Sequence, residues 1–331
     1  MAYDYQKICQ DLIKDLPPKQ KEVVLRRFGL LNKESNESAP ERETLESIGK
    51  SFGITRERVR QIEATSLKDM EPKLKKYKAI FRDFKKYFQK FGGVRKEKTL
   101  FEELGEKKWQ NQAYFLLNLG QGFMRFGENR DFWSSWCLSR DSLSQAKRTV
   151  ETLSQKLEKF QKPFAIKNLA SVVSLRPPVL ESWLEISKKI QRNGEGFYGL
   201  RTWPEINPRG IKDKAFLAFR KVKKPLHFTE VSQLIEGSLV QTVHNELIRD
   251  PRFVLVGRGV YALKEWGYAP GQVKDVISST IKEEGRPLSR EEILEKVLKQ
   301  RMVKENTIFL NLSNKKYFSK DSQGKYWIRE A

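Results

Sequence analysis

The chain has 331 residues, of which 38% are hydrophobic, and a formal net charge of +22, with 64 lysines and arginines against 42 acidic residues. This length favours two or more domains, and the apolar content, which includes 20 Phe and 7 Trp, excludes wholesale disorder. The excess of positive charge favours a polyanionic partner, with a merely solvated basic surface as the alternative.

Several protein classes are excluded by what the sequence lacks. Cys9 and Cys137 are its two cysteines, in no metal-binding spacing, which argues against a disulfide framework or zinc site and favours a reducing cytoplasm. It has no secretory signal at its start and no apolar run of roughly 20 residues, so no membrane span is expected. The histidines are His227 and His244, and no phosphate-binding loop, G-x-S-x-G or H-E-x-x-H motif occurs. We therefore expect no enzyme activity, catalytic residue, metal, cofactor or small-molecule substrate, and we interpret His227 as a packed or capping residue.

The first predicted helix covers residues 18–28. Proline stands near its start, Val23 and Phe28 are available for burial, and Gly29 can end it. An aperiodic segment rich in Ser, Asn and Glu follows at residues 32–43 and predicts an exposed loop.

Two further helices with a sharp turn between them are predicted next. Leu45, Ile48 and Phe52 have the spacing i, i+3 and i+7 of one helix face, and Gly53 permits the turn. Thr55 is a suitable N-cap for the helix that follows. This order of elements is typical of a helix-turn-helix.

The helix that starts at Thr55 has two different faces. At about 100° per residue, its long polar side chains spread over an arc of roughly 140°, and they are Arg56, Glu57, Arg60 and Gln61. Val59 and Ile62 fall on the opposite side and can pack against the preceding helix. The polar side chains are long enough to reach base edges in a major groove. The alternative is a charged solvent face with internal pairing, for example of Glu57 with Arg60.

The segments LPPKQKEVVLRRFGL and ETLESIGKSFGITRERVRQIEATSLKDM, within residues 16–70, resemble region 4 of the sigma-70 family. The resemblance implies that Arg56, Glu57 and Gln61 read bases of promoter-like double-stranded DNA. It also implies that Thr55, Arg58 and Arg60 hold the DNA backbone, and that bacterial RNA polymerase is a partner. In this family the apolar surface of the first helices docks on the flap of the polymerase beta subunit.

Two departures from the family pattern limit this resemblance. About 15 residues precede the segment, so we expect no promoter-melting domain upstream, and none is evident downstream. The loop at residues 32–43 is also longer than usual. A self-sufficient sigma factor is therefore not expected.

The rest of the chain carries a repeat. After a lysine-rich amphipathic connection at residues 70–92, Pro163, Pro225 and Pro287 follow one another at intervals of 62 residues. An aromatic landmark runs in step with them, at Tyr198, Tyr261 and Tyr326. Each repeat is predicted to contain a long helix, a proline-containing connection, two shorter helices and a terminal hairpin. This order suggests a winged helix.

The best-defined copy is the one around Pro225. We predict helices at residues 211–220, 229–235 and 239–248, and strands at 253–256 and 260–263. The runs KPLHFTEVSQLI and DPRFVLVGRGVYALKEWG, within residues 224–267, resemble the HARE-type helix-turn-helix of the RNA polymerase delta subunit. A degenerate copy without the proline fits residues 81–138, with helices at 99–104 and 111–119 and strands at 123–126 and 131–136.

We therefore expect a mainly α fold with small β-hairpins, in which an N-terminal helix-turn-helix is followed by tandem winged-helix domains. The expected modules are the region-4-like domain (1–74), a degenerate winged helix (75–138), a winged helix (139–206), a HARE-like winged helix (207–268) and a C-terminal winged helix (269–331). Arg258 and Lys325 stand at predicted wing tips, where they either contact phosphate or are exposed turn residues.

The leading hypothesis is a cytoplasmic, nucleoid-associated, sequence-specific DNA-binding transcription protein that works with bacterial RNA polymerase at promoters. One alternative is a repressor or architectural protein that never contacts polymerase. Another is a protein-interaction scaffold whose winged helices have lost DNA binding. The residues leave open which winged helices bind DNA and which bind protein.

Overall fold

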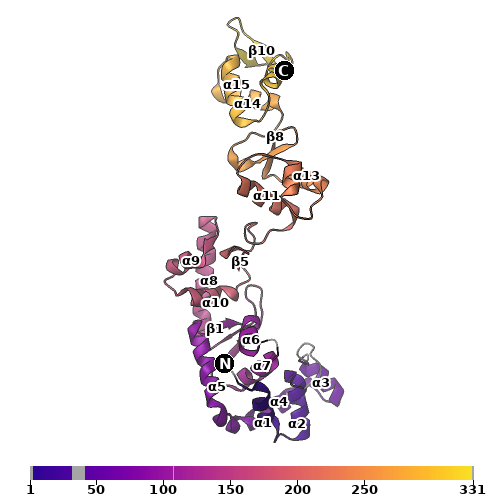
Figure 1. Cartoon of the computed structure of the whole chain (residues 1–331), viewed down its shortest axis with the longest axis vertical. Coiled ribbons are helices and arrows are strands. Elements are labelled where there is room, and N and C mark those ends of the chain that lie inside the picture. The colour runs from indigo at the N-terminus through magenta and orange to yellow at the C-terminus, as the bar shows by residue number, and fades with distance from the viewer. Residues whose placement is uncertain (1–2, 32–41, 107, 330–331) are drawn as a thin grey trace. The chain divides into compact units, whose positions relative to one another are not determined.

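The computed structural model describes residues 3–31, 42–106 and 108–329. It divides into two compact units, Met1–Thr202 and Trp203–Ala331, and each is described by itself. Both are mainly helical with small antiparallel sheets (Figure 1). Within the described ranges, no helix is both long enough and apolar enough to cross a membrane.

The first unit begins with the four helices α1 (Tyr5–Ile13), α2 (Pro18–Phe28), α3 (Leu45–Phe52) and α4 (Arg56–Met70). The predicted bounds of α2 are confirmed, because Pro18 is at its first position and Gly29 ends it with a left-handed φ of 60°. α1 was not predicted, although the Asp4 side chain caps it by accepting from the Lys7 amide. The predicted polar loop falls mainly on residues 32–41, which lie outside the described residues.

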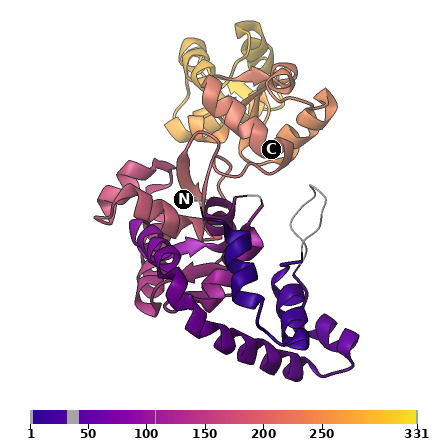
Figure 2. The ribbon, with the colours of Figure 1, turned by 60° about the horizontal axis from the view of Figure 1, so that its bottom comes forward.

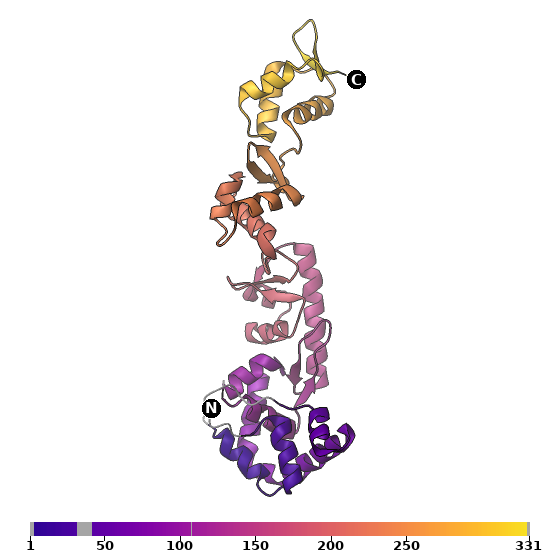
Figure 3. The same ribbon diagram turned by 90° about the vertical axis from the view of Figure 1, so that its right-hand side faces the viewer.

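α4 continues without a break into the 3₁₀ helix η1 (Glu71–Tyr77) and α5 (Lys78–Lys90), and together they form one long helical run (Figure 2). The rest of the first unit contains β1 (Val94–Lys96), α6 (Glu97–Gly105), α7 (Gln110–Leu119), β2 (Met124–Phe126), β3 (Ser135–Cys137), α8 (Arg140–Phe160), β4 (Phe164–Ala165), α9 (Ile166–Val172), α10 (Pro177–Glu185), β5 (Ile190–Arg192) and β6 (Phe197–Leu200). The long α8 lies alongside the β4–β6 sheet (Figure 3).

One apolar core extends from α1 through α5 to the first sheet. Leu12, Phe28, Phe84, Phe115 and Trp136 are almost completely buried and belong to one cluster. The Phe28 and Phe115 ring centroids are 5.1 Å apart, which ties α2 directly to α7. The expected boundary between residues 74 and 75 thus lies inside a continuous core, and the stretch 70–92 supplies part of that core.

The expected boundary between residues 138 and 139 is also bridged by apolar contacts. Val94 and Cys137, from the first sheet, share a cluster with Leu143 of α8 and with Val179 and Trp183 of α10. Gly92 lies just after the end of α5, and a Cβ placed on it would come within 2.5 Å of the Val179 side chain. α10 can pack this closely because residue 92 has no side chain. The first unit therefore packs as a whole up to residue 202.

The second unit contains α11 (Gly210–Val222), β7 (Leu226–His227), α12 (Phe228–Gln233), α13 (Val240–Arg249), β8 (Phe253–Gly257), β9 (Val260–Leu263) and the 3₁₀ helix η2 (Lys264–Trp266). It continues with α14 (Val273–Glu284), α15 (Arg290–Gln300), α16 (Glu305–Leu312), β10 (Phe318–Lys320) and β11 (Tyr326–Ile328). Two apolar clusters lie on either side of residue 268, one around Phe219 and Leu226 and one around Ile281 and Leu288. The helices and strands predicted for the copy around Pro225 are present within a few residues of their expected ends.

The same order of elements occurs four times along the chain. In the first three copies the first strand pairs with the last, which pairs with the middle one, giving the orders β1-β3-β2, β4-β6-β5 and β7-β9-β8. In the fourth copy β10 pairs with β11, and Leu288 forms a single bridge to Tyr326. Pro163 directly precedes β4, Pro225 directly precedes β7, and Pro287 directly precedes the bridging residue Leu288. Each proline of the repeat therefore stands just before the segment that pairs with the hairpin.

Candidate nucleic-acid interface

The two faces of α4 differ as the sequence predicts. The side chains of Arg56, Glu57, Arg60 and Gln61 are all exposed. Val59 is fully buried in a cluster with Val23 of α2 and Ile48 of α3, and Ile62 packs against the same cluster. The predicted packing face is therefore confirmed, and the polar face is open to solvent.

The turn before α4 is fixed by backbone geometry. Gly53 has a left-handed φ of 63°, which a residue without a side chain adopts at no steric cost. A Cβ on Gly49 would lie 2.7 Å from the Ile54 carbonyl oxygen, so α3 can approach the turn this closely because residue 49 is glycine. The Thr55 hydroxyl accepts from the Arg58 amide at 3.2 Å, which confirms the predicted N-cap. These contacts set the direction in which α4 leaves the turn.

The polar face of α4 is partly paired within itself. Arg60 donates through Nε and Nη2 to the Glu57 carboxylate at 2.9 and 2.7 Å, and Arg58 donates to the Gln61 Oε1 at 3.1 Å. The Arg60 guanidinium lowers the pKa of Glu57. Both side chains of this ion pair are more than half exposed, so solvent screens the attraction between them. An external polar group can therefore replace this internal pairing at small cost, and Arg56 forms no ion pair or side-chain hydrogen bond among the described residues.

Polar contacts tie the three helices together at the edge of their apolar cluster. Arg26 of α2 donates from Nε and Nη2 to the Glu43 carboxylate, both at 2.8 Å, and from Nη1 to the Ser51 hydroxyl at 2.7 Å. The Arg26 guanidinium lowers the pKa of Glu43. Arg27 pairs with Glu63 of α4 at 3.4 Å, while burial raises the pKa of Glu63. The start of α3 and the middle of α4 are thereby held against α2.

In each of the four later copies, the second of the two short helices carries at most one lysine or arginine, unlike α4. α7 has no lysine or arginine, and seven of its ten residues are buried. α10 and α16 also lack lysine and arginine, and α13 has only Arg249 in its last turn. Because phosphate contact relies mainly on lysine and arginine, these helices are less suited than α4 to holding a DNA backbone.

The residues predicted to stand at wing tips belong to the second unit. Arg258 is exposed in the turn between β8 and β9, and Lys325 precedes β11 and donates its backbone N–H to Asp321 at 2.8 Å. The interpretation of His227 is confirmed, since it caps α12 by accepting from the Thr229 amide and lies against Phe228. Phosphate contact by Arg258 and Lys325 stays a prediction.

The cysteines are buried and reduced. Cys9 lies in α1 and Cys137 in β3, and neither forms a disulfide. Burial raises the pKa of the Cys137 thiol to about 11, which leaves it protonated and unreactive near neutral pH. No group of three or more His, Cys, Asp or Glu side chains suited to a metal ion occurs in the part of the chain that the structure describes.

A search for related proteins assigns the N-terminal helices. Residues 12–70 match the family model for Sigma-70, region 4. Two proteins named RNA polymerase sigma factor RpoD, from two strains of Helicobacter pylori, are 37% identical to this chain over 84 residues. That stretch is 25% of this chain and 11% of each relative, so the similarity covers a small part of either protein. The first unit therefore contains a sigma-70 region 4 helix-turn-helix, of which α4 is the second helix.

Proposed function

We propose that the protein is a sequence-specific transcription protein of sigma-like type, which binds promoter-like double-stranded DNA through α4 and acts with bacterial RNA polymerase. The observation that carries this proposal is the exposed polar face of α4 inside the region 4 match. In it, Arg56, Glu57 and Gln61 contact bases, while Thr55, Arg58 and Arg60 hold the backbone. The proposal assigns no catalytic step, metal or cofactor.

The side-chain chemistry of this face suits a major groove. An arginine can bind guanine through two hydrogen bonds, a glutamine can do the same with adenine, and a glutamate can accept from the cytosine amino group. Arg56 and Glu57 lie in the first turn of α4, where a recognition helix usually meets the bases. Backbone phosphate near Thr55 would also be stabilised by the positive end of the helix dipole.

The polymerase contact is inferred from the region 4 match and from the similarity to sigma factors. If the beta-subunit flap binds the first helices, it must use what they leave exposed. Val24 and Phe28 of α2 are buried, with Phe28 against Phe115 of α7, whereas Leu31 is 46% exposed and Leu25 is partly buried. We propose that a flap contact, where it forms, centres on Leu25 and Leu31.

In this proposal the four later copies are winged-helix modules that do not read bases. They contact protein, or they set the distance between the DNA-binding helices and a bound protein. Their second helices lack cationic faces, and two of them expose apolar side chains. Leu239 and Leu310 are each 73% exposed and Ile248 is 62% exposed. Protein contact favours such side chains, whereas a DNA groove does not. This observation also supports, for the second unit alone, the scaffold alternative.

Duplex binding by the full chain should depend strongly on salt. Each phosphate neutralised by lysine or arginine adds about 0.9 to the magnitude of the log-log slope of affinity against salt concentration, so several contacts predict a slope of about −3 or steeper. Fluorescence anisotropy of a labelled duplex over a salt series measures this slope. Absence of duplex binding, or a flat salt dependence, would remove the proposal and leave the scaffold alternative.

A further inference from the structure

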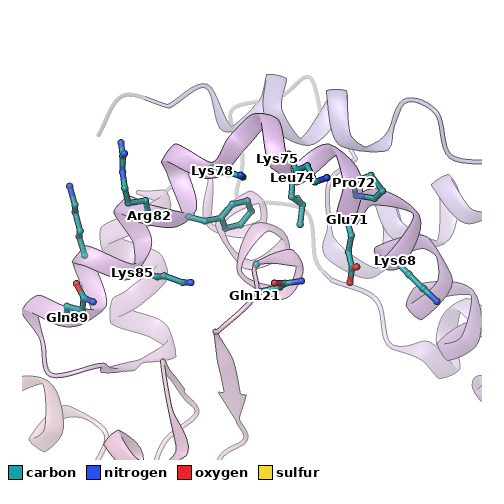
Figure 4. A pocket seen from close by; sticks show the side chains of 13 residues that line it. Lys68, Glu71, Pro72, Leu74, Lys75, Lys78, Arg82, Lys85, Gln89 and Gln121 are labelled. Carbon is teal, nitrogen blue, oxygen red and sulfur yellow. The ribbon is translucent and has the colours of Figure 1, made fainter.

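A groove with an apolar floor that includes Leu74 and Phe81, and with cationic side chains around it, lies beside the helical run that leaves α4. It has a volume of about 990 Å³. Six cationic side chains line it, namely Lys68, Lys75, Lys78, Arg82, Lys85 and Lys86, against one acidic side chain, Glu71. Lys68 belongs to α4, Lys75 to η1 and the other four to α5. Figure 4 shows Gln121 beside this run, in the segment after α7.

The lysines of this groove lack partners inside the protein. Within the described residues, none of its five lysines forms an ion pair or a side-chain hydrogen bond, and Arg82 comes no closer than 4.0 Å to Asp83. Two other lysines of η1 are paired, since Lys76 contacts Asp11 of α1 at 2.9 Å and Lys73 contacts Asp15, just after α1, at 2.8 Å. The positive charge of the groove therefore remains available to an external anion.

The groove is held in shape by the core beneath it. On α5, Lys78, Arg82 and Lys85 have the spacing i, i+4 and i+7 of one helix face. Phe84 on the opposite face is fully buried, and the ring of Phe81 in the groove packs edge-on against it at 6.4 Å. The cations thus project from a segment that cannot move without disturbing the core.

The groove begins on the reading face of α4. Lys68 is seven residues beyond Gln61, which places it about 20° away around the helix axis and roughly 10 Å further along it. A major groove is about 12 Å wide, so a helix whose first turns contact bases brings its later turns to the edge of that groove, where the phosphates are. Lys68 and the η1 and α5 lysines then lie next along the run.

We propose that this groove binds the phosphodiester backbone of the DNA that flanks the sequence contacted by α4. The proposal rests on the proposed function, because it assumes that α4 contacts duplex DNA. Lysine is a point charge without the planar geometry that recognises bases, so the groove adds affinity without sequence preference. Except for Lys68, its cations lie outside residues 12–70, so they extend the interface beyond the region 4 match.

The test compares two doubly substituted variants of the full chain. K78Q/K85Q removes two charges from the groove, and K159Q/K167Q removes two exposed charges elsewhere in the first unit, where neither side chain forms an ion pair or hydrogen bond with another described residue. A preferred site is first selected from randomised duplex DNA with the unmodified chain. Two probes follow, one trimmed to that site and one extended on each side by about two helical turns, or roughly 20 base pairs.

On the extended probe, K78Q/K85Q should make the log-log salt slope shallower by about 1.8, which is two lost phosphate contacts. Its preference for the selected site over random duplex should be unchanged, and K159Q/K167Q should keep the original slope. On the trimmed probe, all three proteins should have the same slope. The charge-conserving variant K78R/K85R should restore the slope on the extended probe, which separates lost charge from altered folding.

The groove proposal would be overturned if K78Q/K85Q kept the original log-log salt slope on the extended probe. The proposed function would still stand in that case, provided that the unmodified chain prefers the selected site. If in addition this variant alone lost capture by purified RNA polymerase, the groove would bind an acidic protein surface instead of DNA. Absence of duplex binding by the unmodified chain would overturn both the proposed function and the groove proposal.

Discussion

Alanine at Arg56, Glu57 or Gln61 is expected to reduce the preference for a selected site over random duplex by about 1 to 3 kcal/mol for each lost base contact. This corresponds to a loss of roughly 5- to 150-fold in relative affinity. The three side chains are exposed, and the helix is held by Val59 on its other face, so the thermal unfolding of each variant should stay close to that of the unmodified chain. Competition binding with labelled preferred and random duplexes measures the preference.

Arg58→Ala is the matched control for these variants. Arg58 is also exposed on α4 and is proposed to contact the backbone, so its loss should weaken binding to both duplexes by a similar factor. If the Arg56, Glu57 and Gln61 variants kept the full site preference, α4 would not read bases. The region 4 domain would then be a polymerase-docking module.

Phe84→Ala is expected to destabilise the whole N-terminal part of the first unit by about 3 to 5 kcal/mol, the usual cost of removing a buried phenylalanine ring. Its side chain is fully buried, and its ring centroid lies 6.5 Å from that of Tyr5 and 6.3 Å from that of Phe123. Because the cluster joins α1 and α2 to α5 and α7, the helix-turn-helix should lose stability together with the module after it. DNA binding should weaken on all sequences alike.

Urea unfolding, followed by hydrogen exchange of the α2 amides, measures this coupling. Phe160→Ala is the control, since Phe160 is 46% exposed on α8 and the loss of its edge contact with Phe164 at 5.3 Å should cost about 1.5 kcal/mol or less. Normal protection of α2 in the Phe84→Ala protein, with loss of protection in α5 and α7, would show that the two parts have separate cores.

Local signals account for the parts of the fold that the sequence predicts well. Pro18 and Gly29 set the ends of α2, and Gly53 with Thr55 sets the turn into α4, because each acts through its own backbone geometry or its own side chain. The division of α4 into two faces needs only the period of a helix. The exposed polar face of α4 could therefore be predicted before any tertiary contact was known.

Other features depend on contacts between distant residues. The two-residue strand β4 exists because Phe164 pairs with Tyr198, and no periodicity can be read from so short a segment. Arg95 has no sequence signal for burial, yet it is buried and donates to Tyr87 and Glu185 from separate elements. The stretch 70–92 was predicted as a connection, since its alternation of lysines and aromatics shows amphipathicity but does not reveal which core it joins.

Genome-wide mapping of the sites that this protein occupies, in parallel with RNA polymerase, is the most direct test of the central claim. We expect bound sites to coincide with promoters occupied by polymerase and to share a sequence element. The Arg56→Ala protein should lose enrichment at these sites. Binding that is spread without relation to promoters, or that is unchanged by Arg56→Ala, would contradict a sigma-like function for α4.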